Sequence, residues 1–170
     1  MSGENESKTQ QQTIEERLGN IDQLLSEYES AIGIPKIYKI NTQKIQEYLQ
    51  MDRDELKTLN AEDCSEISFA LSQASFYVQK EHNKENAKYN WAEAQINGLI
   101  AAKVSEYKGY SFDERKLKAI ADNSAAIKLQ KIKVEAKLRI DRLNGISSQL
   151  QYMSKTMNDL KFAKREIKNG

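Results

Sequence analysis

The chain has 170 residues, of which 26 are Lys or Arg and 25 are Asp or Glu, so its formal net charge is only +1. No apolar run approaches the roughly 20 residues of a membrane span, and the single cysteine, Cys64, excludes an intrachain disulfide. One proline, seven glycines and abundant Ala, Glu, Lys, Gln and Leu predict an all-α fold. We expect a soluble, cytoplasmic protein without a signal peptide.

The small net charge conceals an asymmetry between the two parts of the chain. Residues 1–98 carry 10 Lys and Arg against 17 Asp and Glu, whereas residues 99–170 carry 16 against 8. The C-terminal part is therefore +8 and the remainder −7. Such a split indicates an anionic partner for the basic part and a different contact for the acidic part.

The first 60 residues divide into a polar tail and short acidic helices. Residues 1–12 are almost free of apolar side chains, which predicts a disordered tail. Thr13 and Glu16 have the spacing of a capping box, and the helix that they start should end before Pro35. Two shorter helical patterns follow and complete a segment of short helices over residues 13–60.

Residues 61–170 predict a long antiparallel helical hairpin. Apolar residues recur at three- and four-residue steps from about 62 to 107, which predicts one helix on the order of 65 Å long. Gly109 is expected to follow the last turn of this helix. Ser111 and Glu114 then form a second capping box, so a new helix should start at once and run back along the first.

The C-terminal helix carries the most regular apolar stripe of the chain. Before it, residues 122–124 allow either a break or a polar turn of helix. The stripe consists of Leu129, Ile132, Ala136, Ile140, Leu143, Ile146, Leu150, Met153, Met157 and Leu160. It should pack against the first long helix, another subunit, or both. Because only 39% of the residues are hydrophobic, we expect the chain to form a homo-oligomer through this helix.

Signals of an enzyme are nearly absent. His82 is the only histidine, and it lies three residues before Glu85. One such pair without a second His-containing segment is typical of a solvated helix face rather than of a metal site. The sequence also lacks a glycine-rich phosphate loop. We therefore expect no catalytic residue, no metal and no cofactor.

Basic and aromatic residues are interleaved at the expected hairpin tip. The candidate nucleic-acid-binding residues are Lys103, Tyr107, Lys108, Tyr110, Arg115, Lys116 and Lys118, with Phe112 among them. Cations that follow phosphates and rings that stack on bases together make a platform for single-stranded nucleic acid. In the alternative interpretation, Tyr107 and Phe112 pack the end of the hairpin and the lysines only keep it soluble.

A second basic run follows on the C-terminal helix, within residues 128–142. Lys128, Lys131, Glu135, Arg139 and Arg142 share one helix face, offset from the apolar stripe. A mostly cationic ridge can lie on a phosphate backbone. It can equally pair with acidic residues of a neighbouring helix, and the sequence leaves both interpretations open.

Over residues 65–168, this layout resembles the UvsY-like recombination mediator proteins of T-even-type phages. The family's Lys-Ala-Arg-Leu segment, linked to single-stranded DNA, falls on Ala101-Ala102-Lys103-Val104, where Lys103 keeps the second basic position and Ala101 replaces the first. The resemblance implies a non-enzymatic oligomer in the infected host cell. It would bind single-stranded DNA and help a RecA-like recombinase to displace single-strand-binding protein and load onto the strand.

A different class of protein has a similar sequence pattern. A helical structural or assembly protein, such as a phage virion adaptor or a coiled-coil scaffold, would also combine long helices with a polar tail. The two hypotheses differ in what the basic part contacts, because only a mediator should bind single-stranded DNA in a salt-dependent way.

Overall fold

The computed structural model describes residues 13–34 and 40–169, and all regular elements in these ranges are helices. The elements are α1 (Ile14–Ala31), α2 (Thr42–Gln50), α3 (Arg53–Thr58), α4 (Ala61–Ile100), the 3-10 turn η1 (Val104–Glu106), α5 (Phe112–Ala121), α6 (Ser124–Leu143) and α7 (Ile146–Asn169). The predicted all-α class is confirmed. The predicted tail at 1–12 lies outside the described residues.

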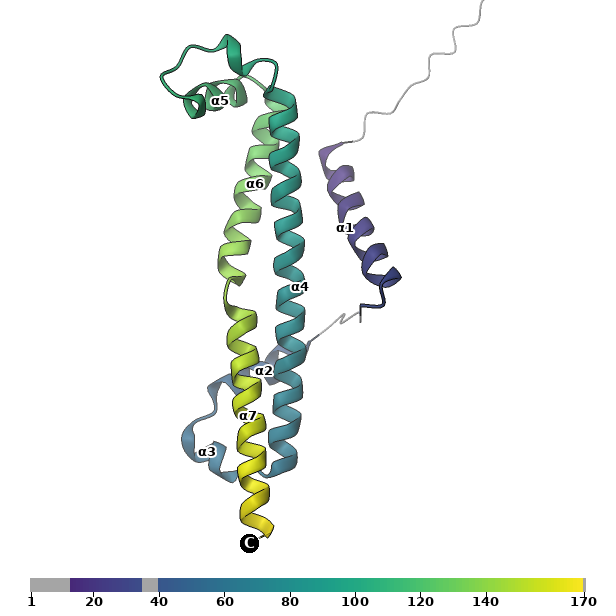
Figure 1. Ribbon diagram of the computed structural model, residues 1–170, viewed down its shortest axis with the longest axis vertical. Coiled ribbons are helices and arrows are strands. Elements are labelled where there is room, and N and C mark those ends of the chain that lie inside the picture. The colour runs from purple at the N-terminus through teal and green to yellow at the C-terminus, as the bar shows by residue number, and fades with distance from the viewer. Residues whose placement is uncertain (1–12, 35–39, 170) are drawn as a thin grey trace, which may run out of the picture.

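A long antiparallel hairpin dominates the molecule (Figure 1). Helix α4 forms one arm, and α6 and α7, placed end to end, form the other. Helix α5 lies across one end of the hairpin, α2 and α3 lie at the opposite end, and α1 lies beside α4. The apolar stripe of the C-terminal arm packs against α4 of the same chain, which is the first of the contacts that the sequence allowed.

Side-chain caps set where the helices begin. Thr13 and Glu16 form the predicted capping box, in which Thr13 N donates to Glu16 Oε2 at 2.7 Å and Glu16 N donates to Thr13 Oγ1 at 3.2 Å. Ser111 caps α5 as predicted by accepting from Glu114 N at 3.1 Å. The Glu114 carboxylate, however, accepts from Tyr110 N at 2.9 Å, so it ties down the loop before the helix.

Two apolar clusters hold the ends of the hairpin. The tip cluster contains Ile96, Ile100, Val104, Ala119, Ile120, Ala126 and Leu129, which come from α4, η1, α5 and α6. The base cluster contains Cys64, Ile67, Leu71, Ala74, Leu150 and Met157, and half-buried residues of α2 and α3 pack against it. Burial of each large side chain in such a cluster stabilises the fold by roughly 1.5–3 kcal/mol.

Polar side chains also line the seam between α4 and the other arm, in part among the residues of the base cluster. The buried Ser75 hydroxyl donates to the Ser147 carbonyl at 2.9 Å, and the Ser68 hydroxyl donates to the Ser154 carbonyl at 2.9 Å. Small serine side chains let two helix backbones approach closely, and their hydroxyls are satisfied by the facing helix. Farther along the seam, the buried Glu85 carboxylate faces α6.

The first arm ends earlier than the sequence predicts. The expected helix over about 62–107 stops at Ile100, and the chain tightens into η1, where Lys103 N donates to Ile100 O and Glu106 N donates to Lys103 O. The tighter turn brings Val104 into the tip cluster, so tertiary packing overrides helix propensity here. Gly109 therefore does not terminate the helix, and it lies instead in the following loop.

The second arm is interrupted twice. Asn123 caps α6 by accepting from Ala125 N and Ala126 N, both at 3.0 Å, so residues 122–124 form a true break. A further break, which the sequence analysis did not predict, separates α6 from α7 at Asn144 and Gly145. Gly145 has a φ of +79°, a conformation that is strained for any side chain. The apolar stripe continues across this break, which is why its regularity predicted one helix.

We predict that Gly145→Ala lowers the free energy of unfolding by about 1 kcal/mol, because alanine is disfavoured at a positive φ. No heavy atom outside the chain neighbours lies within 4 Å of the Cβ position, so the effect is conformational rather than steric. Gly98→Ala, inside α4 and equally open, is the matched control and should raise stability by about 0.5–1 kcal/mol. Urea unfolding measures the free energy of unfolding of both variants. Equal stabilisation by the two alanines would mean that α6 and α7 form one helix in solution.

Candidate nucleic-acid interface

The hairpin tip brings together all seven predicted binding residues. They lie between the end of α4 and the last turns of α5, where the chain reverses (Figure 1). Five of the residues are cationic and two are aromatic. Their side chains differ, however, in how far the surrounding structure already uses them.

The loop before α5 is fastened down by side chains of α5. Lys118 Nζ donates to the Lys108 carbonyl and to Glu114 Oε1, both at 2.8 Å. Gly109 packs beneath Arg115, whose Cγ would lie 3.0 Å from a Cβ at this position. The hydrogen bond from Lys118, followed by that from Tyr110 N, lowers the pKa of Glu114. Lys118 and Arg115 thus shape the loop.

Tyr107 also has a structural role. Its ring is half-buried against the tip cluster, and its hydroxyl donates to Asp122 Oδ2 at 2.8 Å. This hydrogen bond is the main reason that the pKa of Tyr107 is raised. The contact pins η1 to the junction of α5 and α6, so the Tyr107 ring is not presented for stacking on a base.

The remaining tip residues are available to a ligand. Tyr110 is fully exposed, and Lys103 and Lys108 are exposed without an ion pair among the described residues. Lys116 is half-buried. Phe112 is 60% exposed, which contradicts the interpretation that this ring packs the end of the hairpin. Phe112 follows the Ser111 cap directly and begins α5 at the tip, and this position in the sequence is consistent with an exposed ring.

The basic run over residues 128–142 contains cations of two kinds: some pair with acidic residues of α4, and others remain exposed. Lys133 Nζ pairs with Glu93 at 2.6 Å, and Arg139 Nε pairs with Glu85 at 2.7 Å, so these two cations engage acidic residues of α4. Three other cations of the run are exposed and form no ion pair within the described part of the chain. They are Lys128, Lys131 and Arg142.

Glu85 is the most buried charged residue of the described chain, at 8% exposure. It accepts from Arg139 Nε at 2.7 Å and from Lys88 Nζ at 3.2 Å. Burial alone would raise the pKa of Glu85, but the hydrogen bonds and charges of Arg139 and Lys88 outweigh burial and lower it. This carboxylate therefore stays ionised and joins α4 to α6.

The described residues offer no metal centre. No group of three or more His, Cys, Asp and Glu side chains among them could hold an ion. Glu85 is engaged by its two donors, and His82 Nδ1 lies 3.2 Å from the amide nitrogen of Asn86. The Cys64 thiol is buried in the base cluster, and burial raises its pKa. None of the helices in the described ranges combines the length and apolar character of a membrane span.

Comparisons of the chain with protein-family models, with curated proteins and with solved structures find no match.

We predict that Glu85→Gln lowers the free energy of unfolding by roughly 1 kcal/mol at pH 7, because a charged hydrogen bond is replaced by a weaker neutral one. This loss of stability is small because the Arg139 side chain is half-exposed, so solvent weakens its attraction to Glu85. The folded-state pKa of Glu85 lies below its ordinary value of 4.5, so its contribution is present above that value and is lost as pH falls through the folded-state pKa.

Denaturant unfolding of parent and variant from pH 7 to pH 3 tests this prediction. The difference between the two proteins should shrink as the solution is acidified. Glu81→Gln, on the same helix and without an ion pair in the described structure, is the control and should change stability little. A constant difference across this pH range would contradict the role given to the Glu85 carboxylate.

Proposed function

We propose that this protein binds single-stranded DNA without sequence preference through the hairpin tip. The observation that carries the proposal is the pair of exposed rings, Tyr110 and Phe112, together with two nearby cations, Lys103 and Lys108, that form no ion pair within residues 13–34 and 40–169. Exposed aromatic rings are unfavourable in water unless something covers them, and bases can do so. Stacking contributes roughly 1–3 kcal/mol per base, and the lysines can neutralise neighbouring phosphates.

The architecture of the tip suits this role. The loop is held by Lys118 and Tyr107, which have their own hydrogen-bond partners, and Arg115 packs against Gly109. Little ordering entropy then remains to be lost when a strand binds. The strong salt dependence expected of phosphate contacts gives the interaction a clear experimental signature.

We further propose that the protein acts as a recombination mediator, without enzymatic activity of its own. In this role it would hold single-stranded DNA and help a RecA-like recombinase to load in place of single-strand-binding protein. The support is the resemblance to UvsY-like mediators over residues 65–168 together with the surface chemistry of the tip. The proposed setting is the cytoplasm of an infected host cell.

Self-association is part of the proposal. Many large apolar side chains are exposed outside the seam of the hairpin, and on α6 they include Ile127, Val134 and Leu138, spaced seven and four residues apart. This spacing places them on one face of the helix. A homo-oligomer would cover these side chains and would repeat the tip, which converts weak individual contacts into avidity.

The same exposed side chains favour a second candidate function. A helical assembly protein, such as a virion adaptor or scaffold, would use them to contact other copies or other chains and would have no need for DNA. The two candidates share the oligomer but differ in the role of the tip.

Charge reversal at the tip tests DNA binding. We predict that Lys103→Glu/Lys108→Glu weakens binding of labelled oligo(dT) and flattens the plot of log affinity against log salt by about 1.4, at about 0.7 per phosphate contact. Lys155→Glu/Arg165→Glu, which reverses two exposed cations of α7 far from the tip, makes the same change in net charge. Fluorescence anisotropy across a salt series measures both variants. An equal loss of oligo(dT) affinity in the two variants would contradict a binding site at the tip.

A loading assay separates the mediator from the scaffold. We predict that the protein shortens the lag before a RecA-like recombinase hydrolyses ATP on single-stranded DNA already covered by single-strand-binding protein. The Lys103→Glu/Lys108→Glu variant should lose this effect. A protein that self-associates, binds no oligo(dT) and leaves the lag unchanged would support the scaffold instead.

A further inference from the structure

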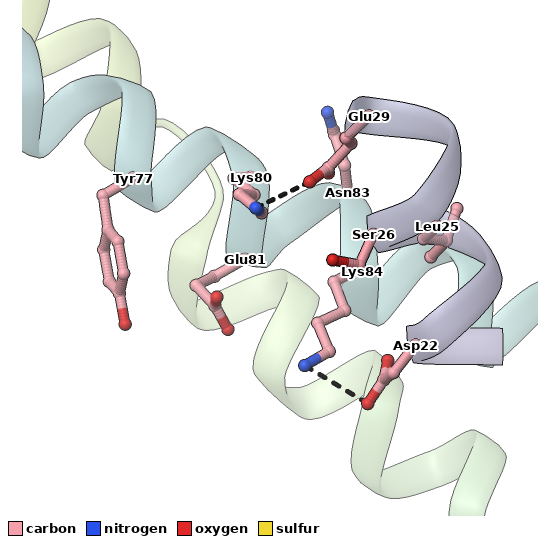
Figure 2. A pocket seen from close by; sticks show the side chains of 9 residues that line it. All are labelled: Asp22, Leu25, Ser26, Glu29, Tyr77, Lys80, Glu81, Asn83 and Lys84. Atoms are coloured by element: carbon pink, nitrogen blue, oxygen red, sulfur yellow. Dashed lines mark ion pairs between the residues drawn. The ribbon is translucent and has the colours of Figure 1, made fainter. Parts of the chain in front are cut away.

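Helix α1 docks on α4 through ion pairs (Figure 2). Lys80 Nζ lies 2.6 Å from Glu29 Oε2, and Lys84 Nζ lies 3.2 Å from Asp22 Oδ2. Lys88 Nζ lies 3.7 Å from the same Asp22 oxygen. Two acidic residues of α1 thus meet three cations of α4.

The three lysines form a continuous stripe on α4. They are spaced four residues apart, so they share one face of the helix and span about 12 Å at 1.5 Å per residue. We call Lys80, Lys84 and Lys88 the lysine stripe. Lys80, the most closely paired of them, has a side chain 26% exposed. Without α1, Lys80 and Lys84 would lose their ion-pair partners in the described structure, whereas Lys88 would keep its contact with Glu85. The stripe would then form a surface for a linear polyanion.

Helix α1 is strongly acidic, with five acidic residues and one arginine among its 18 residues. Apolar and ionic contacts share the docking, because Leu18, Ile21 and Leu25 are half-buried along one face of the helix. Leu24, Tyr28 and Ile32 are exposed, whereas Ile14, at the start of the helix, packs against the tip cluster. Asp22 and Glu29 thus add ion pairs with the lysine stripe to this apolar face.

The α1–α4 contact is incompletely packed. A hollow of about 290 Å³ remains between the two helices, lined in part by Leu25, Ser26 and Tyr77 (Figure 2). Asp22 Oδ1 is buried without a hydrogen-bond partner among the described residues. A buried oxygen without a partner is unfavourable, so this contact is weaker than its ion pairs alone would suggest.

We infer that the lysine stripe is a second polyanion-binding surface, that α1 occupies it in the free protein, and that the phosphate backbone of single-stranded DNA displaces α1. The inference rests on the proposed function, because it supposes that a strand is already held at the tip. Replacing carboxylates by phosphates keeps the lysines paired, so the free-energy cost of displacing α1 comes mainly from its half-buried apolar side chains. If single-stranded DNA binds the stripe only modestly more tightly than α1 does, the population shifts from the docked to the displaced state of α1.

Geometry favours a nucleic acid over an acidic protein segment. The stripe and the tip lie along the same arm, since Lys88 precedes Lys103 by 15 residues, and most of that interval is helix α4. At 1.5 Å per residue, the separation is about 22 Å. A strand that leaves the tip along α4 can reach the stripe, and two linked contacts reinforce each other.

Neutralising the two anchor residues of α1 tests the inference. Asp22→Asn/Glu29→Gln should bind oligo(dT) roughly 3- to 10-fold more tightly than the parent, because weakened ion pairs no longer hold α1 over the stripe. The salt slope should steepen by up to about 1.4, at about 0.7 for each of Lys80 and Lys84, because Lys88 stays paired with Glu85. Glu27→Gln is the control, since Glu27 is exposed on α1 and bonds only to Gln23 among the described residues.

Two further measurements use the full chain. Adding Lys80→Gln/Lys84→Gln to the anchor variant should abolish most of the gain in affinity, and Lys88 is left unchanged because it also donates to Glu85. Hydrogen exchange of the parent should show that saturating oligo(dT) removes protection from the amides of α1 and leaves those of α6 protected. Circular dichroism checks that the variants keep their helices.

The outcomes separate the two proposals. If the parent binds oligo(dT) but the anchor variant gains no more than Glu27→Gln, or if α1 stays protected when DNA saturates the protein, the inference is wrong and the tip is unaffected. If neither the parent nor the anchor variant binds oligo(dT), the proposed function fails and the inference fails with it. If the anchor variant gained affinity for poly-glutamate but not for oligo(dT), the inference would be overturned in favour of an acidic protein partner.

Discussion

The pairing of α4 with the joined α6 and α7 is the interaction on which the rest of the structure depends. Apolar burial at the two ends of this seam fixes the hairpin, and the reversal at the tip follows from it. Because the tip cluster holds η1 and α5, the loop between them can present Tyr110 and Phe112 to solvent without losing its shape. The proposed binding surface is thus a consequence of core packing some distance from it.

The middle of the seam serves a different purpose from its ends. A buried carboxylate such as Glu85 is tolerated only because two cationic side chains donate to it, and removing either donor would leave a buried charge with too few partners. Such a contact fixes which residues of α4 and α6 face each other, whereas apolar contacts alone would allow the helices to slide. Lys88 links this contact to Asp22, so the ionic middle of the hairpin is also where α1 attaches.

Much of the fold follows from periodicity and caps in the sequence. The capping box at Thr13, the short helices and the hairpin were predicted because local spacing and tertiary packing favour the same conformation there. The break at Gly145 and the early end of α4 were not predicted, since an apolar stripe keeps its period across a single glycine and Val104 turns inward for a tertiary reason. Homo-oligomerisation stays a prediction, now based on exposed side chains rather than on an uncovered stripe.

The tip residues were found from composition, but their roles could not be. The sequence does not reveal that Tyr107 donates to Asp122 or that Lys118 caps the loop, because both contacts need the folded chain. It likewise cannot reveal that Lys133 and Arg139 pair with α4, since their acidic partners lie 40 and 54 residues earlier in the chain. The ion pairs between α1 and α4 depend on the path of the chain between helices and had no local signal.

The central claim is that single-stranded DNA contacts the exposed rings of the hairpin tip. Photo-cross-linking with an oligo(dT) that carries 5-bromodeoxyuridine, followed by peptide mass spectrometry, tests this claim directly because stacked bases cross-link efficiently to aromatic side chains. The account predicts cross-links on the tip peptide at Tyr110 or Phe112, lost at high salt. Cross-links confined to other exposed rings, such as Phe69 near the base or Tyr152 on α7, would contradict it.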